Sequence, residues 1–282
     1  MSQRQAVVFE SRGVPLVGVI EVPSAPRSTA LLVVTGGPQY RVGSHRQFAL
    51  LCRALAAHDI AAMTFDFRGS GDSGGVRASF EDIGPDIQAA INKLCATIPS
   101  VRRVAILGLC DAASAALMSV GSDARVAGLL LLNPWVRSEG SLERARVEDY
   151  YPDKLASGLF WKRLLSGKIN IIKSLVSFFQ HLATARQSGQ AAVQAQPDFL
   201  RQMLNGVREF SGELQIVLSG QDMTAQEFRG LLESSSEWRE ATKNVRQHEI
   251  PAANHTFASA QWRDEVSCLC VAFVNRIDSS NE

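Results

Sequence analysis

Hydrophobic residues occur in short continuous runs that alternate with longer stretches of helical spacing. The run ALLVVTGG at 30–37 is almost entirely apolar and ends in glycines, a pattern typical of a strand buried on both faces. Residues 45–58 then place apolar side chains on one helical face, with Ser44 as the expected N-cap. This part of the chain therefore predicts a buried strand followed by an amphipathic helix.

The same alternation continues along most of the chain. Residues 5–10 and 14–21 predict a hairpin. Further strands are predicted at 30–37, 60–69, 101–108, 126–134, 213–220 and 244–251, with helices at 45–58, 79–98, 111–121, between the last two strands and at 259–277. Alternating strands and helices indicate an α/β fold with a doubly wound, mostly parallel sheet of eight strands.

The alternation stops between residues 138 and 208, which are helical in pattern and carry no clear strand signal. A helical insertion is predicted there, and it divides the sheet domain into residues 1–137 and 209–282. Aromatic and aliphatic residues at 150–180 are expected either to line an acyl pocket or to pack on the sheet as ordinary helices. The pattern within the insertion does not separate these two alternatives.

Chemically active side chains follow three of the predicted strands. Cys110, Asp222 and His255 each come shortly after a different strand, and functional groups of parallel α/β sheets gather at the carboxyl ends of the strands. A nucleophile, an acid and a histidine in this order predict a catalytic triad. The thiol would attack an acyl carbon, the imidazole would exchange its proton, and the carboxylate would fix the imidazole tautomer.

The loops around Cys110 supply candidate oxyanion donors and substrate contacts. The backbone N–H groups of Gly37 and Asp111 are predicted to form the oxyanion hole, since Pro38 has no N–H to donate. Gln39 is a candidate substrate contact. Arg46 is expected either to bind an anionic group of the substrate or to lie in solvent at the start of a helix.

Each triad candidate has a structural alternative. Cys110 taken alone would be a buried thiol, His255 a surface loop residue, and Asp222 a turn residue with Glu227 as a less favoured substitute. A helix N-terminus and a neighbouring histidine favour the Cys110 thiolate, whereas the carboxylate of Asp111 disfavours it. The sequence leaves the balance of these two effects open.

The combined motifs resemble the α/β-hydrolase superfamily over nearly the whole chain. The resemblance rests on the elbow GLCDA, on DFRGSGDS at 66–73, and on the late acid and histidine in order. It implies the α/β-hydrolase fold, with residues 138–208 as a helical cap and the 66–73 loop as a brace beside the site. Cysteine at the elbow departs from the common serine, as in the dienelactone-hydrolase branch. Ala112 and Thr35 depart from the usual glycine and histidine.

Two stretches carry a narrower resemblance. GGPQYRVGSHRQF and GLCDAASA resemble the hydrolases associated with the exosortase A system, type 1 branch. This resemblance implies a bacterial setting in exopolysaccharide and protein-sorting loci. It implies no defined substrate.

Composition restricts the partners and the compartment. The formal net charge of +1 and the hydrophobic fraction of 46% predict a soluble globular protein with no electrostatic reason to bind nucleic acid. MSQRQAVVFES has no apolar signal-peptide core and no run is long enough to span a bilayer, so a cytoplasmic protein without stable membrane insertion is expected. Five scattered cysteines indicate no disulfide framework, and Cys268 and Cys270 are expected to be buried structural thiols rather than zinc ligands.

The sequence thus predicts a hydrolase that cleaves a small acyl ester, thioester or lactone through a covalent acyl-enzyme on Cys110. The substrate would be a small molecule, and the chemistry needs no metal or organic cofactor. One alternative is an acyltransferase that uses the same site to acylate a sugar or lipid carrier. Another is a non-catalytic binding protein in which Asp111 and the altered oxyanion loop abolish catalysis. No feature indicates an oligomeric state.

Overall fold

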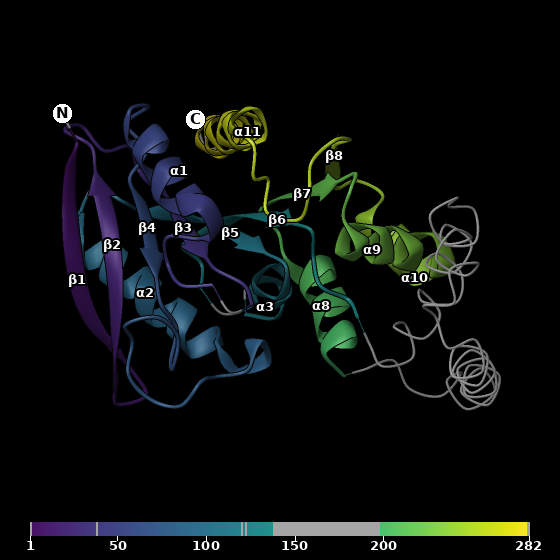
Figure 1. Cartoon of the computed structure of the whole chain (residues 1–282), viewed down its shortest axis with the longest axis horizontal. Helices are drawn as coiled ribbons and strands as arrows, with labels where there is room; N and C mark the ends of the chain where they lie inside the picture. Colours follow the sequence, from purple (N-terminus) through teal and green to yellow (C-terminus); the bar gives the residue numbers. More distant parts are fainter. Residues whose placement is uncertain (1, 38, 120, 122, 138–197, 281–282) are drawn as a thin grey trace, which may run out of the picture. The chain divides into compact units, whose positions relative to one another are not determined.

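A computed structural model of the chain describes residues 2–37, 39–119, 121, 123–137 and 198–280 (Figure 1). Met1–Val136 and Arg201–Glu282 form one compact unit, and the fold described below is that of this unit. Most of the insertion predicted at 138–208 lies outside the described residues. Its assignment as a cap therefore stays a prediction.

Eight strands form one sheet. Their bounds are β1 Gln3–Ser11, β2 Val14–Val22, β3 Thr29–Val34, β4 Ala62–Phe65, β5 Arg103–Leu109, β6 Val126–Leu132, β7 Glu213–Ser219 and β8 Arg246–Ile250. The strand order is β1-β2-β4-β3-β5-β6-β7-β8, with β1 and β2 antiparallel to their neighbours and all other pairs parallel. The predicted eight-stranded, mostly parallel sheet is confirmed.

Burial separates the central strands from the first hairpin. β3 is buried at every position and β5 at all but its first, which explains their continuous apolar runs. β1, at the edge of the sheet, and β2, beside it, mix buried positions with more exposed ones. Arg12 and Gly13 join them with φ of 48° and 75°, the left-handed conformations that a two-residue hairpin turn requires.

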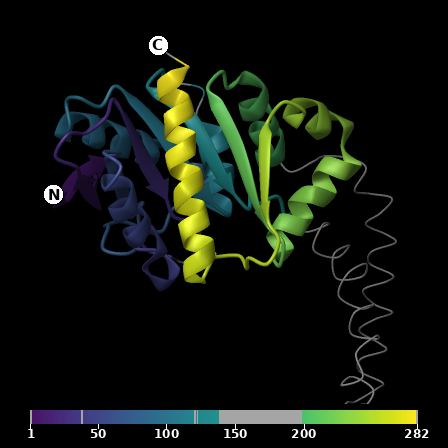
Figure 2. The same cartoon turned by 90° about the horizontal axis from the view of Figure 1, so that it is seen from above.

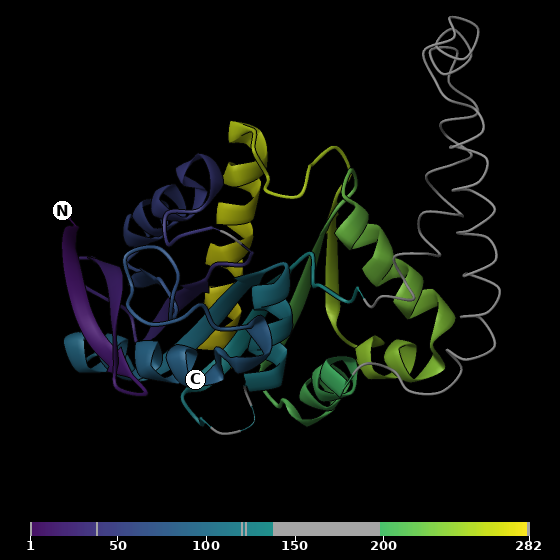
Figure 3. The same cartoon turned by 60° about the horizontal axis from the view of Figure 1, so that its bottom comes forward.

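Helices cover both faces of the sheet. Their bounds are α1 Gln47–Ala56, α2 Gly84–Thr97, α3 Asp111–Ser119, α8 Asp198–Glu209, α9 Met223–Ser234, α10 Ser236–Thr242 and α11 Ala260–Ser279. Figures 1 and 3 show α1 and α11 on one face and α2, α3 and α8 on the other, the doubly wound arrangement that the alternation predicts. Within the described part of the chain, no helix combines the length and apolar character needed to cross a membrane.

The expected N-cap at Ser44 is wrong, because α1 begins three residues later. Ser44–Arg46 form a short 3-10 turn in which His45 and Arg46 have φ of 52° and 59°, and no side chain caps α1. The Ser44 N–H is held instead by the Gln39 side chain at 3.1 Å. The apolar spacing fixes the buried face of this helix, but the left-handed residues before it set where the helix starts.

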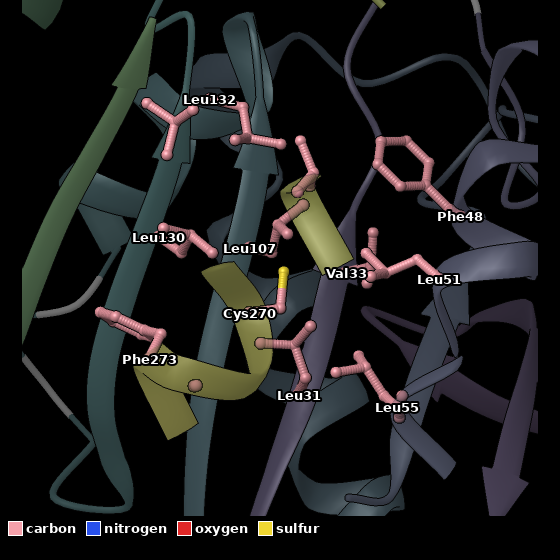
Figure 4. Close-up of a cluster of buried hydrophobic side chains, with 14 of the residues drawn as sticks. Leu31, Val33, Phe48, Leu51, Leu55, Leu107, Leu130, Leu132, Cys270 and Phe273 are labelled. Carbon is pink, nitrogen blue, oxygen red and sulfur yellow. The ribbon is translucent and has the colours of Figure 1, made fainter. Parts of the chain in front are cut away.

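The main core lies between the sheet and the helices α1 and α11. Figure 4 shows Val33 and Leu107 of the sheet packed near Phe48 of α1 and Cys270 of α11. Figure 2 shows α11 lying along the strands, and α11 contacts β3, β6 and β7. This packing fixes the central strands, and the candidate active site is built on the loops that follow them.

Candidate active site

Cys110 stands at a strained turn between β5 and α3. Its φ is 62°, a left-handed conformation that costs a non-glycine residue about 1 kcal/mol or more. Its N–H donates to the Leu132 carbonyl at 2.9 Å, and its carbonyl accepts from the Trp135 N–H at 3.2 Å. A Cβ on Gly108 would lie 2.6 Å from the Ala113 Cα atom, so only glycine fits there. The predicted strand, sharp elbow and helix are therefore all present.

Asp222 and His255 lie together at the ends of neighbouring strands. Asp222 follows β7, His255 follows β8, and the His255 Nδ1 atom is 2.9 Å from Asp222 Oδ2. The Asp222 carboxylate also accepts from the N–H groups of Thr224 and Ala225, at 3.3 and 3.2 Å, and so caps α9. One carboxylate thus combines the turn role and the histidine contact that the sequence presented as alternatives.

The Cys110 side chain lies close enough to His255 to act on its pKa. The hydrogen bond to Asp222 and then the interaction with Cys110 raise the pKa of His255 from 6.5 to about 10, against the opposing effect of burial. Because Nδ1 faces Asp222, Nε2 is the ring atom left for the thiol. The structure brings the three predicted triad residues into one connected group.

Asn133 ties the triad loops together and was not anticipated from the sequence. It is fully buried, with φ of 46°, directly after β6. Its Oδ1 accepts from the Ser219 N–H at 2.8 Å, and its Nδ2 donates to Ser219 Oγ at 2.9 Å and to the His255 carbonyl at 3.2 Å. A polar residue directly behind an apolar strand is the signal that could have identified it.

The Asp111 side chain contacts the Gly37 loop, which the sequence predicts to form part of the oxyanion hole. The Gly37 N–H, predicted to bind the oxyanion, donates to the Asp111 carboxylate with a distance of 2.7 Å from N to Oδ1. Burial raises the pKa of the Asp111 carboxyl, although hydrogen bonds from the backbone of Gly37 and Ala112 oppose this rise. The Asp111 side chain therefore contacts the loop, whereas the sequence analysis expected the carboxylate to act on the Cys110 thiol and only the backbone N–H to belong to the oxyanion hole.

The structure gives other surroundings to the two predicted substrate contacts, Gln39 and Arg46. Gln39 uses its side-chain oxygen to hold the Ser44 N–H at 3.1 Å, and Arg46 is exposed at the start of α1. Among the described residues, no hydrogen bond joins either side chain to Cys110, Asp222 or His255. Their proposed role in substrate binding stays untested.

The loop after β4 is a structural brace. Asp66 is fully buried and accepts from the Arg41 N–H at 2.6 Å, while Ser73 Oγ donates to the Asp66 carbonyl at 2.6 Å. Arg68 forms an ion pair with the buried carboxylate of Asp86 at 2.8 Å. Internal bonds thus hold the geometry of this loop, in keeping with the bracing role that the family resemblance implies.

All five cysteines are free thiols. Cys52 and Cys270 are buried, and burial raises the pKa of both thiols. Cys268 is exposed, so the expectation of a buried thiol is wrong there. Two positions along a helix turn a side chain by about 200°, which places Cys268 and Cys270 on opposite faces of α11. Among the described residues, no three His, Cys, Asp or Glu side chains form a metal-binding group.

A cavity of about 650 Å³ lies between α3 and α8. Leu117, Val126 and Gly206 contribute to its lining. Val126 is the first residue of β6, so the cavity opens near the amino ends of the strands. It does not belong to the candidate active site, which lies at the carboxyl ends.

Comparisons with known proteins agree with this architecture. Residues 31–267 match the family model described as the alpha/beta hydrolase family. The chain is similar to the esterase Pf2001 of Pyrococcus furiosus, with 17% identity, coverage of 98% of this chain and 93% of that chain, and a TM-score of 0.65. It is also similar to Est1E of Butyrivibrio proteoclasticus, a structure with bound ferulic acid, with 14% identity, coverage of 97% and 100%, and a TM-score of 0.62.

A third similar structure is the alpha/beta hydrolase GrgF of a Penicillium species, with 17% identity, coverage of 97% and 98%, and a TM-score of 0.63. No curated protein sequence matches the chain. At these identities the solved structures show the shared fold, and the family match covers most of the chain. The chain belongs to the alpha/beta hydrolase family.

Proposed function

We propose that the protein hydrolyses a small acyl ester, thioester or lactone with Cys110 as nucleophile, His255 as base and Asp222 as orienting acid. The observation that carries this proposal is the connected group of the three side chains. His255 Nδ1 lies 2.9 Å from Asp222 Oδ2, and the ring lies close enough to Cys110, on the strained elbow, for the thiol to act on its pKa.

In the first step, the Cys110 thiol passes its proton to His255 Nε2 as Sγ forms a bond to the acyl carbon, and the carbonyl oxygen becomes an oxyanion. The bond from the acyl carbon to the leaving oxygen or sulfur then breaks as the carbonyl reforms. His255 gives its proton to the leaving group. The raised pKa of His255 favours proton transfer from the thiol, because Asp222 stabilises the imidazolium that forms.

In the second step, His255 takes a proton from water, and the water oxygen attacks the acyl carbon. The bond from carbon to Sγ breaks, which releases a carboxylic acid and restores the thiol and imidazole pair. Asp222 holds Nδ1 throughout, so the same ring atom faces Cys110 in both steps.

The substrate class is proposed from the chemistry of the triad. Residues 138–208 serve in this proposal as a cap that shapes the acyl pocket. The setting in exopolysaccharide and exosortase loci remains a prediction from the family resemblance.

The hydrogen bond from the Gly37 N–H to the Asp111 carboxylate favours one other function. If this N–H does not bind an oxyanion, the chain is a hydrolase-fold binding protein that forms no acyl-enzyme. Turnover distinguishes this alternative from the proposal.

Hydrolysis of a panel of p-nitrophenyl esters, acyl thioesters and lactones tests the proposed function. Wild type and Cys268→Ala are expected to hydrolyse at least one compound at equal rates, and Cys110→Ala none, because Cys268 is a free thiol on a surface helix. Equal turnover by wild type and Cys110→Ala would overturn the proposal, and so would the absence of turnover across the panel. Product formed on added sugar or lipid alcohols would identify a transferase instead.

A further inference from the structure

Asp111 and Gly37 make a contact in the candidate site that the triad chemistry does not use. The residues are 74 positions apart, yet Gly37 N donates to Asp111 Oδ1 at 2.7 Å. The same N–H is the proposed oxyanion donor. A carboxylate and a substrate oxyanion therefore compete for one hydrogen-bond donor.

The loop is built to admit the carboxylate. A Cβ on Gly36 would lie 2.3 Å from Asp111 Oδ1 and 2.2 Å from the Leu109 carbonyl oxygen, so a side chain there would collide with both. Gly36 thus lets the carboxylate approach the backbone closely. A Cβ on Gly37, by contrast, would meet nothing within 4 Å, so space is open on that side of the loop.

Two opposing effects act on the charge of the Asp111 carboxylate: the positive charge of Arg77 stabilises it and burial destabilises it. Arg77 donates to the Gly37 carbonyl, and its charge acts on Asp111 in the direction that favours the carboxylate. Burial acts more strongly in the opposite direction and raises the pKa of the Asp111 carboxyl. A charge that is penalised by burial loses little when its carboxylate gives up the hydrogen bond from Gly37 and turns toward water beside the site.

We propose that Asp111 is a specificity-determining residue whose carboxylate must leave the Gly37 N–H before the acyl oxygen of a substrate can bind there. This role rests on the proposed acyl-transfer function. Substrates with an anionic group beside the reacting carbonyl are disfavoured, because the displaced carboxylate remains close to that carbonyl. Neutral acyl groups are the class that this arrangement accepts.

Two reactions of Cys110 distinguish competition for the Gly37 N–H from an effect of Asp111 on the reactivity of the thiol. Acylation by p-nitrophenyl acetate forms an oxyanion, whereas alkylation by iodoacetamide displaces iodide and forms none. A change in the charge beside Cys110 alters both rates, but removal of a competitor for Gly37 alters acylation alone. All variants carry Cys268→Ser, which removes the exposed thiol.

Asp111→Ala is expected to raise the ratio of acylation rate to alkylation rate about tenfold, and Asp111→Asn by less, because its amide oxygen still accepts from Gly37. Glu237→Gln, which removes an exposed carboxylate on α10, should leave the ratio unchanged. Thermal unfolding of each variant checks that the fold is retained.

If the ratio of acylation rate to alkylation rate in Asp111→Ala lies within twofold of the wild-type ratio, or below it, the role of Asp111 is overturned. Acylation of Cys110 in the same experiment would still support the proposed function. Absence of acylation in every variant, with alkylation intact, overturns the proposed function and this role with it. The p-nitrophenyl monoester of succinate, which is anionic, is compared with neutral p-nitrophenyl acetate to test the selection by charge. The acylation rate with the succinate ester, divided by that with the acetate ester, should be higher in Asp111→Ala than in wild type. An unchanged quotient contradicts selection by charge.

Discussion

His255 and Asp222 are 33 positions apart, and the Nδ1 atom of His255 lies 2.9 Å from Oδ2 of Asp222. The contact exists because β7 and β8 are parallel neighbours, so the loops that follow them meet at the same edge of the sheet. Asn133, behind β6, holds the adjoining backbone through Ser219 and the His255 carbonyl. Three successive strands of the sheet therefore fix one imidazole.

Substitution of Asp222 should separate its two roles. Asp222→Asn retains a cap oxygen for α9 but loses the negative charge and one carboxylate oxygen, so acylation should fall at least about tenfold with little loss of stability. Asp222→Ala also removes the cap and should lower the free energy of unfolding by about 1 kcal/mol. Acylation kinetics and urea unfolding measure the two effects. Equal acylation by wild type and Asp222→Asn would refute the orienting role.

The strained elbow predicts a difference between two inactive variants. Because Cys110 has φ of 62°, Cys110→Gly should be more stable than Cys110→Ala by about 1 kcal/mol, since glycine adopts this conformation without a Cβ penalty. Neither variant should form an acyl adduct. Urea unfolding checks the order, and a more stable alanine variant would contradict a strained elbow.

Stability should depend on pH through His255. Its pKa of about 10 in the folded protein exceeds the ordinary value of 6.5, so its contribution is fully present below pH 6.5 and is lost as the pH rises through 10. The difference in free energy of unfolding between wild type and His255→Gln should therefore be larger at the acidic end of this range. Urea unfolding of both proteins across the range measures it. A difference that is independent of pH would show that the imidazolium is not stabilised.

Asn133→Ala should lower the free energy of unfolding by about 2 kcal/mol, because the buried Ser219 N–H would lose its acceptor. Acylation should slow as well, since the His255 carbonyl would lose its donor. Asn92→Ala, at an exposed helix position, is the matched control and should change stability by less than about 0.5 kcal/mol. Identical stabilities of the two variants would remove Asn133 from the framework of the site.

Local patterns predicted the sheet and the elbow because both depend on short segments. Apolar runs such as 30–37 give buried strands directly, and Gly108 beside Cys110 marks the sharp turn. The start of α1 was missed because the left-handed backbone at His45 and Arg46 overrides a good cap residue at Ser44.

The contact between Asp111 and Gly37 could not be predicted from the sequence patterns either. It joins two loops that approach only because β3 and β5 pair in parallel within the sheet. The same applies to Asn133, whose partners come from two later strands and loops. Chain order predicted the three triad candidates, but the packing of neighbouring strands determines which groups each side chain contacts.

Intact-mass spectrometry after mixing with activated acyl esters and thioesters tests the central proposal most directly. Wild type should gain one acyl group, mapped to Cys110. The adduct should be absent in Cys110→Ala, and it should form more slowly in His255→Gln, which folds with a neutral side chain in place of the imidazole. An acyl group that never forms on wild type, or that forms equally on Cys110→Ala, would contradict a cysteine nucleophile.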